Sequence, residues 1–92
     1  MDILLVEDNE TVAKGLIYSL NQQDYTVKPA INIKQAMEII NRESVNLIIL
    51  DISLPDGDGF VLYENEIYSR NIPTIFLTAR DDEDDIVKGL ES

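Results

Sequence analysis

Short apolar runs alternate along the chain with segments in which apolar residues recur at helical spacing. The runs at 3–6, 45–50 and 74–77 are almost unbroken, which is typical of strands buried on both faces of a sheet. Residues 25–30 are rich in β-branched and aromatic side chains. Because Pro29 cannot donate a hydrogen bond to a neighbouring strand, we expect this segment to form an edge strand.

Four amphipathic helices are predicted between and after these strands. Their apolar stripes lie at residues 12–20, 33–40, 60–67 and 86–90. Asn9 can cap the first helix, and Asn32 with Gln35 forms a capping box for the second. The third helix is expected to end near Asn71, and the acids at 81–85 favour the start of a fourth helix because they offset its dipole.

Four alternations of strand and helix with short connections predict an α/β fold, in which helices cover both faces of a parallel sheet. In a doubly wound sheet of order 2-1-3-4, the first and third strands are neighbours and a crevice opens at their carboxyl ends. The 92 residues, 10.4 kDa in mass, suffice for one small domain. We therefore expect residues 1–92 to form a single domain.

Composition narrows the chemistry that such a domain can perform. Eighteen Asp and Glu against seven Lys and Arg give a net charge of -11, which disfavours direct binding to nucleic acid or to an anionic membrane. The absence of Cys and His excludes thiolate and imidazole ligands and bases. No apolar run is long enough to span a membrane and no leader precedes the first strand, so we expect a cytoplasmic protein.

Acids follow the buried strands at the places where those strands are expected to meet. Glu7, Asp8 and Asp51 end the first and third strands, and Thr78 brings a hydroxyl to the same rim. A single acid at a wet strand end needs no function. Three carboxylates crowded together repel one another, and a hard divalent cation with oxygen ligands is the usual remedy. The set also suits a phosphoryl group carried on a carboxylate.

Several spaced motifs link these residues to a known family. They are Leu4-Leu5-Val6-Glu7-Asp8-Asn9, Leu50-Asp51, Leu54-Pro55, Asp58-Gly59, and Pro73 leading to Leu77-Thr78-Ala79-Arg80. With these motifs in this order, the whole chain resembles the receiver domain of bacterial two-component response regulators. The resemblance implies a flavodoxin-like fold and a signalling function rather than an enzyme, with at most catalysis of its own phosphorylation and dephosphorylation.

The resemblance also implies a role for each residue of the site. Asp51 would accept a phosphoryl group from the histidine of a sensor histidine kinase, and Asp8 together with Asp51 would hold Mg²⁺. Glu7 would reach the metal through water, and Ser53 would offer its backbone carbonyl to it. Thr78 would bind a phosphoryl oxygen. The phosphorylated domain would then control an effector.

The segment 78–84 resembles receivers attached to winged-helix DNA-binding domains. This implies that the parent protein binds DNA and regulates transcription, although this chain does not. The fourth helix would belong to the surface through which activated receivers pair.

The family pattern also contains a fifth strand with a phosphoryl-binding Lys and a fifth helix, for which 92 residues leave no room. We therefore expect 1–92 to be a truncated receiver domain with four strands and four helices, and Lys88 to be a solvated helix residue rather than a substitute. The loss would leave the fourth strand as an open edge. We expect a homo-oligomer formed through that edge or through helix four, and slow phosphorylation.

Two other functions fit parts of the sequence. An aspartyl-phosphate phosphatase could use Asp51, but such enzymes usually have a second Asp two residues later, where this chain has Ser53. A phosphorylation-independent interaction module would not need the acids at all. A calcium loop at Asp56 and Asp58 is rejected, because Phe60 occupies the next ligand position.

Overall fold

The computed structural model describes residues 1–77. The strands are β1 (Asp2–Val6), β2 (Thr26–Ala30), β3 (Leu47–Asp51), β4 (Ser53–Leu54), β5 (Gly57–Asp58) and β6 (Thr74–Leu77). The helices are α1 (Glu10–Gln22), α2 (Ile33–Arg42) and α3 (Gly59–Leu62), and α3 continues into a π-helical turn (Tyr63–Ile67) and a 3-10 turn (Tyr68–Arg70). None of the helices in this part of the chain is long and apolar enough to cross a membrane. The predicted fourth helix, its acidic start and Lys88 lie outside the described residues.

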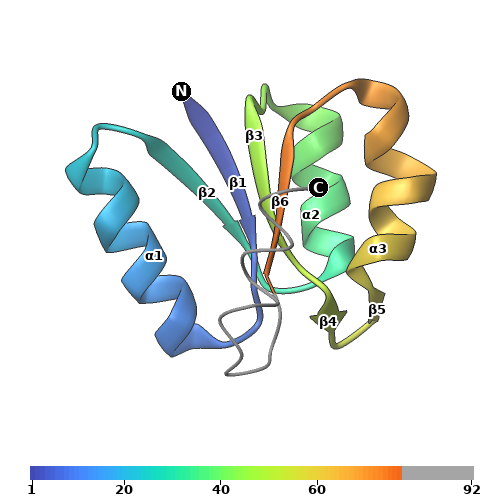
Figure 1. The fold of residues 1–92 in the computed structure, drawn as a ribbon, viewed down its shortest axis with the longest axis horizontal. Helices are drawn as coiled ribbons and strands as arrows, with labels where there is room; N and C mark the ends of the chain where they lie inside the picture. Colours follow the sequence, from blue (N-terminus) through green and yellow to red (C-terminus); the bar gives the residue numbers. More distant parts are fainter. Residues whose placement is uncertain (78–92) are drawn as a thin grey trace.

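The main sheet has four strands in the order β2-β1-β3-β6, and every neighbouring pair is parallel (Figure 1). This confirms the predicted order 2-1-3-4 and places the Pro29-containing strand at an edge. Val6 lies opposite Ala30 on one side and Leu50 on the other, so β1 and β3 end at the same edge of the sheet. The residues that follow these two strands are therefore neighbours.

Helices cover both faces of the sheet, with α1 on one side and α2 and α3 on the other (Figure 1). Successive strand residues point to opposite faces, so each apolar run supplies both cores. The core on the α2 and α3 side contains buried residues from strands and helices, including Leu4, Val6, Ile48, Leu50, Ala36, Leu62 and Ile67. The core on the α1 side contains the buried residues Ile3, Leu5 and Ile49.

The helices on the two faces differ in how far their side chains are buried. Helix α2 buries Ala36 and Ile40, whereas α1 has no buried residue and covers the sheet with a partly buried apolar stripe. That stripe consists of Ala13, Leu16, Ile17 and Leu20. The face under α1 is therefore the more lightly covered one.

Both long helices begin where the capping residues predicted. The Asn9 side chain accepts a hydrogen bond from the Val12 N–H at 3.1 Å. At α2, the Asn32 side chain accepts from the Gln35 N–H at 2.8 Å, and Gln35 Oε1 accepts from the Ile31 N–H at 3.0 Å. The first of these two bonds satisfies a backbone donor that the helix start leaves free, and the second satisfies the N–H of the residue before the cap.

The connection from β3 to α3 differs from the prediction. The turn residues of segment 52–59, such as Pro55, Asp56 and Gly57, predict a loop, but β4 and β5 pair as a short antiparallel hairpin, with Ser53 opposite Asp58. The apolar stripe at 60–67 predicted one amphipathic helix, and the structure has an α-helix over its first four residues, followed by the π and 3-10 turns. It ends as predicted near Asn71, which has a left-handed backbone with φ 58°.

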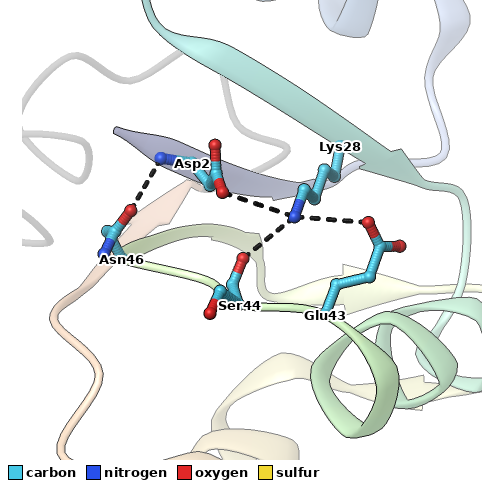
Figure 2. Close-up of polar contacts among 5 residues, drawn as sticks. All are labelled: Asp2, Lys28, Glu43, Ser44 and Asn46. Atoms are coloured by element: carbon cyan, nitrogen blue, oxygen red, sulfur yellow. Dashed lines mark hydrogen bonds and ion pairs between the residues drawn. The ribbon is translucent and has the colours of Figure 1, made fainter.

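A compact ion-pair network ties together elements at the amino-terminal edge of the sheet (Figure 2). Lys28 Nζ in β2 lies 3.5 Å from Asp2 Oδ2 and 3.2 Å from Glu43 Oε1, and it donates a hydrogen bond to the Ser44 carbonyl at 2.9 Å. Asn46 Oδ1 accepts from the Asp2 N–H at 2.8 Å. The three protons of one ammonium group are thereby matched by three oxygen partners.

Candidate functional site

The carboxylates of Glu7, Asp8 and Asp51 come together at the carboxyl-terminal edge of the sheet. One carboxylate oxygen from each lies within 4.8 Å of those of the other two. Glu7 and Asp8 directly follow β1, and Asp51 is the last residue of the adjacent β3. The expected convergence of acids from separate strand ends is confirmed, because parallel pairing aligns the two strand ends.

Two of the three acids are buried. Glu7 is 8% and Asp51 2% exposed, whereas Asp8 is exposed. Backbone groups orient both buried carboxylates: Glu7 Oε2 accepts from the Asn9 N–H at 3.3 Å, and Asp51 Oδ1 accepts from the Ser53 N–H at 3.2 Å. These bonds fix the side chains before any ligand arrives.

Burial and crowding change the proton affinity of Glu7. Its pKa is raised to about 8 by burial first of all, then by hydrogen bonding to the Asp51 carboxyl and by the negative charge of that group, with a smaller contribution from Asp8. The hydrogen bond from the Asn9 N–H acts in the opposite direction. Without a cation, Glu7 therefore retains a proton near neutral pH.

The donor set fits a hard divalent cation. It offers only carboxylate oxygens, which Mg²⁺ prefers, and it combines two fixed buried groups with one exposed group. Within residues 1–77, none of the three acids forms an ion pair with Lys or Arg. The negative charge gathered there is left for a ligand to neutralise.

The other two predicted site residues are placed differently. Ser53 lies in β4, two residues after Asp51, and its N–H is already bonded to the Asp51 carboxylate. Thr78 lies outside the described residues. Asp58, one of the two acids of the rejected calcium loop, caps α3 by accepting from the Phe60 N–H at 2.7 Å.

Gly59 is a residue of the site that sequence reasoning did not single out. A Cβ at this position would collide with the Asp51 carbonyl oxygen, so no other residue fits here without a shift of the backbone. The Gly59 N–H also donates to the Ile52 carbonyl at 2.7 Å. Gly59 thus lets α3 begin directly against the end of β3. Its only signal in the sequence is its place in the Asp58-Gly59 motif.

Comparison with known proteins gives consistent matches across the chain. Residues 3–92 match the family model described as the response regulator receiver domain. The chain is 36% identical over 90 residues to the transcriptional regulatory protein AfsQ1 of Streptomyces coelicolor, covering 98% of this chain and 40% of that protein. It is 35% identical over 92 residues to the transcriptional regulatory protein HprR of Escherichia coli, covering 100% and 41%. The chain thus spans about two fifths of the length of these curated relatives.

Solved structures agree with this assignment. The non-phosphorylated HemR receiver domain of Leptospira biflexa matches with a TM-score of 0.78 and 36% identity, over 98% of this chain and 73% of that one. The BeF3-activated receiver domain of Klebsiella pneumoniae RstA matches with a TM-score of 0.82 and 31% identity, over 99% and 78%. The chain therefore belongs to the receiver domain family of two-component response regulators, which are signalling domains rather than enzymes.

Proposed function

We propose that Asp51 is the phosphoacceptor of this domain and that Asp8 and Asp51 hold Mg²⁺, with Glu7 acting through water and Ser53 through its backbone carbonyl. Thr78 would bind a phosphoryl oxygen. The observation that carries the proposal is the approach of three carboxylates to within 4.8 Å of one another. Bound Mg²⁺ would neutralise the acids and the incoming phosphoryl oxygens.

Asp51 has the properties that a phosphoryl acceptor needs. Its side chain is buried, and the Ser53 N–H holds one carboxylate oxygen in a fixed position. The carboxylate attacks phosphorus while the bond from phosphorus to the kinase histidine breaks. Positioning of the nucleophile is a large part of catalysis in phosphoryl transfer. Activation of the related RstA receiver domain with BeF3 supports the same chemistry here.

We further propose that residues 1–92 act as one receiver unit whose phosphorylation controls transcription through a longer parent protein. The relatives AfsQ1 and HprR are transcriptional regulatory proteins and are more than twice as long as the matched region. The net charge of -11 argues that any DNA contact is made elsewhere in such a parent. A kinase partner and a DNA target both place the protein in the cytoplasm.

For partners, we propose a sensor histidine kinase and a second copy of this chain. In the described part of the chain, β6 pairs with β3 and lies at the end of the sheet order. An edge strand presents backbone donors and acceptors to another edge. Sedimentation at increasing concentration should show a dimer or larger species, and a pure monomer throughout would contradict self-association.

Phosphorylation of the purified chain tests the central proposal. Incubation with acetyl phosphate and Mg²⁺, followed by intact mass measurement, should add one phosphoryl group, slowly if the chain lacks the family's phosphoryl-binding Lys. Asp51→Asn and omission of Mg²⁺ should each abolish the addition. Asp58→Asn serves as a control, because Asp58 caps α3 and its amide replacement still offers an oxygen to the Phe60 N–H. Labelling that persists in Asp51→Asn would refute the assignment.

A further inference from the structure

The turn of the β4–β5 hairpin is attached to a helix that lies far from it in the sequence. Asp56 Oδ1 accepts from the Ile33 N–H at 2.9 Å, and Asp56 Oδ2 accepts from the Lys34 N–H at 3.1 Å. Both donors belong to the first turn of α2, where backbone N–H groups have no partner inside the helix. One carboxylate thus satisfies two free donors across more than twenty residues of sequence.

Further observations show that this contact is close and charge-assisted. A Cβ on Gly57 would lie 2.7 Å from Ile33 Cδ1, so the hairpin backbone packs directly on the first residue of α2. The hydrogen bond from the Ile33 N–H lowers the pKa of Asp56, so the group is ionised at neutral pH and faces the positive end of the helix dipole.

The other end of the same hairpin holds the phosphoacceptor side chain. Ser53 pairs with Asp58 at the base of the hairpin, and the Ser53 N–H donates to Asp51 Oδ1 at 3.2 Å. A chain of direct contacts therefore runs from α2 through Asp56 and the two short strands to the Asp51 carboxylate. A two-stranded hairpin of four paired residues has little stability of its own and needs such an anchor.

We propose that Asp56 is a positioning residue for the acidic site, because its grip on the start of α2 fixes the hairpin that orients Asp51 through the Ser53 N–H. The proposal rests on the assignment of Asp51 and Asp8 as metal ligands. It differs from that assignment in naming a residue that touches neither the metal nor the phosphoryl group.

Amide hydrogen exchange without metal tests the positioning role on its own. Asp56→Ala should speed exchange at Ser53 as well as at Ile33 and Lys34. Asn32→Ala is the matched control, because Asn32 caps the same helix through the Gln35 N–H and does not touch the hairpin. This control should speed exchange within α2 and leave Ser53 unchanged. Unchanged exchange at Ser53 in Asp56→Ala would overturn the proposal.

Mg²⁺ titration by calorimetry tests the consequence for the site. Asp56→Ala should weaken Mg²⁺ binding about three- to tenfold, less than the loss of a group that contacts a ligand directly. Asp56→Asn keeps an oxygen for the Ile33 N–H and should restore most of the affinity. Asp24→Asn is the control for charge, because it removes one negative charge in the segment before β2, and it should leave Mg²⁺ binding unchanged. Asparagine tolerates the φ of 65° at this position.

The variants separate the possible explanations. If Asp56→Asn and Asp24→Asn weaken Mg²⁺ binding as much as Asp56→Ala does, the effect is due to the loss of charge. If Asn32→Ala weakens Mg²⁺ binding to the same extent, the effect is due to the stability of α2. Either result overturns the proposal. Failure of the unaltered chain to bind Mg²⁺ would instead refute the metal site, while exchange at Ser53 would still decide the role of Asp56. If Asp56→Ala does not fold, amide exchange in Asp56→Asn decides the role of Asp56. We then expect a smaller increase in the exchange rate at Ser53.

Discussion

Acidic side chains gather at both edges of the sheet, and among residues 1–77 a Lys or Arg pairs with them at the amino-terminal edge but not at the carboxyl-terminal edge. At the amino-terminal edge, Lys28 contacts Asp2, Glu43 and the Ser44 carbonyl (Figure 2). At the carboxyl-terminal edge, Glu7, Asp8 and Asp51 crowd together, and no Lys or Arg of residues 1–77 pairs with them. We call the first set the balanced cluster, because its acids are paired with Lys28 and it holds β1, β2 and the end of α2 together. We call Glu7, Asp8 and Asp51 the unbalanced cluster, because these carboxylates repel one another and a bound cation would reduce that repulsion.

The comparison shows what distinguishes the acids that hold elements together from the acids proposed to bind a ligand. Every acid discussed lies at or near a strand or helix end, so position alone does not separate the two groups. Charge balance does, because an uncompensated buried carboxylate is costly unless it is protonated or meets a cation. The raised pKa of Glu7 records this cost.

Removing the charge of Glu7 in the unbalanced cluster should have the largest effect on the stability of the chain. Because the folded pKa of Glu7 is about 8 and its ordinary value is 4.5, the folded chain binds the extra proton between these values. The contribution of Glu7 to the stability of the metal-free chain should therefore be complete below pH 4.5 and be lost as pH rises toward 8, by at most about 1.4 kcal/mol per pH unit. Glu7→Gln should flatten this decline in urea unfolding measured with EDTA, and an unchanged pH profile would contradict the raised pKa.

Mg²⁺ should stabilise the chain through the unbalanced cluster alone. At a free Mg²⁺ concentration one hundred times its Kd, the free energy of unfolding should rise by about 2.7 kcal/mol, because only the folded state holds the ligands together. Thermal unfolding with and without Mg²⁺ measures this increment. Asp8→Asn should remove most of it and Lys28→Met should leave it intact. Equal increments in Asp8→Asn and the unaltered chain would place the metal elsewhere.

Breaking the balanced cluster should lower the free energy of unfolding by a smaller amount, and this loss should be the same with and without Mg²⁺. Lys28→Met removes a partly buried ammonium with three partners, so we expect a loss of about 1–2 kcal/mol in the free energy of unfolding. Lys14→Met is the control, because the Lys14 and Glu10 pair at 3.4 Å is exposed and should contribute only about 0.3–0.5 kcal/mol. Equal losses in the two variants would mean that the Lys28 network has no special stability.

Sequence patterns predicted the sheet and the acidic cluster because both depend on simple periodicity. Apolar runs identified three of the four main strands, and β-branched and aromatic residues identified the fourth; parallel strand ends must share an edge, which brought Asp8 and Asp51 together. The resemblance to receiver domains, which the comparisons confirm, supplied the roles now proposed for these residues.

The features that sequence patterns missed depend on contacts between distant segments. Asp56 lies 23 residues from Ile33, and Lys28 lies 16 residues from Ser44, so no local sequence motif indicates either contact. The β4–β5 hairpin is too short to show strand alternation, and the π-helical turn after Leu62 lies within an ordinary helical stripe. Their geometry is decided by the packing of the whole domain.

The light coverage under α1 sets the order in which the domain can come apart. Because α1 holds the sheet through a partly buried stripe and no fully buried side chain, its detachment exposes less apolar surface than that of α2. We therefore expect α1 to swing away from the strands before the rest of the domain loses its structure. Limited digestion should first cleave within this helix, which would divide the chain into a piece that contains β1 and a piece that begins near β2.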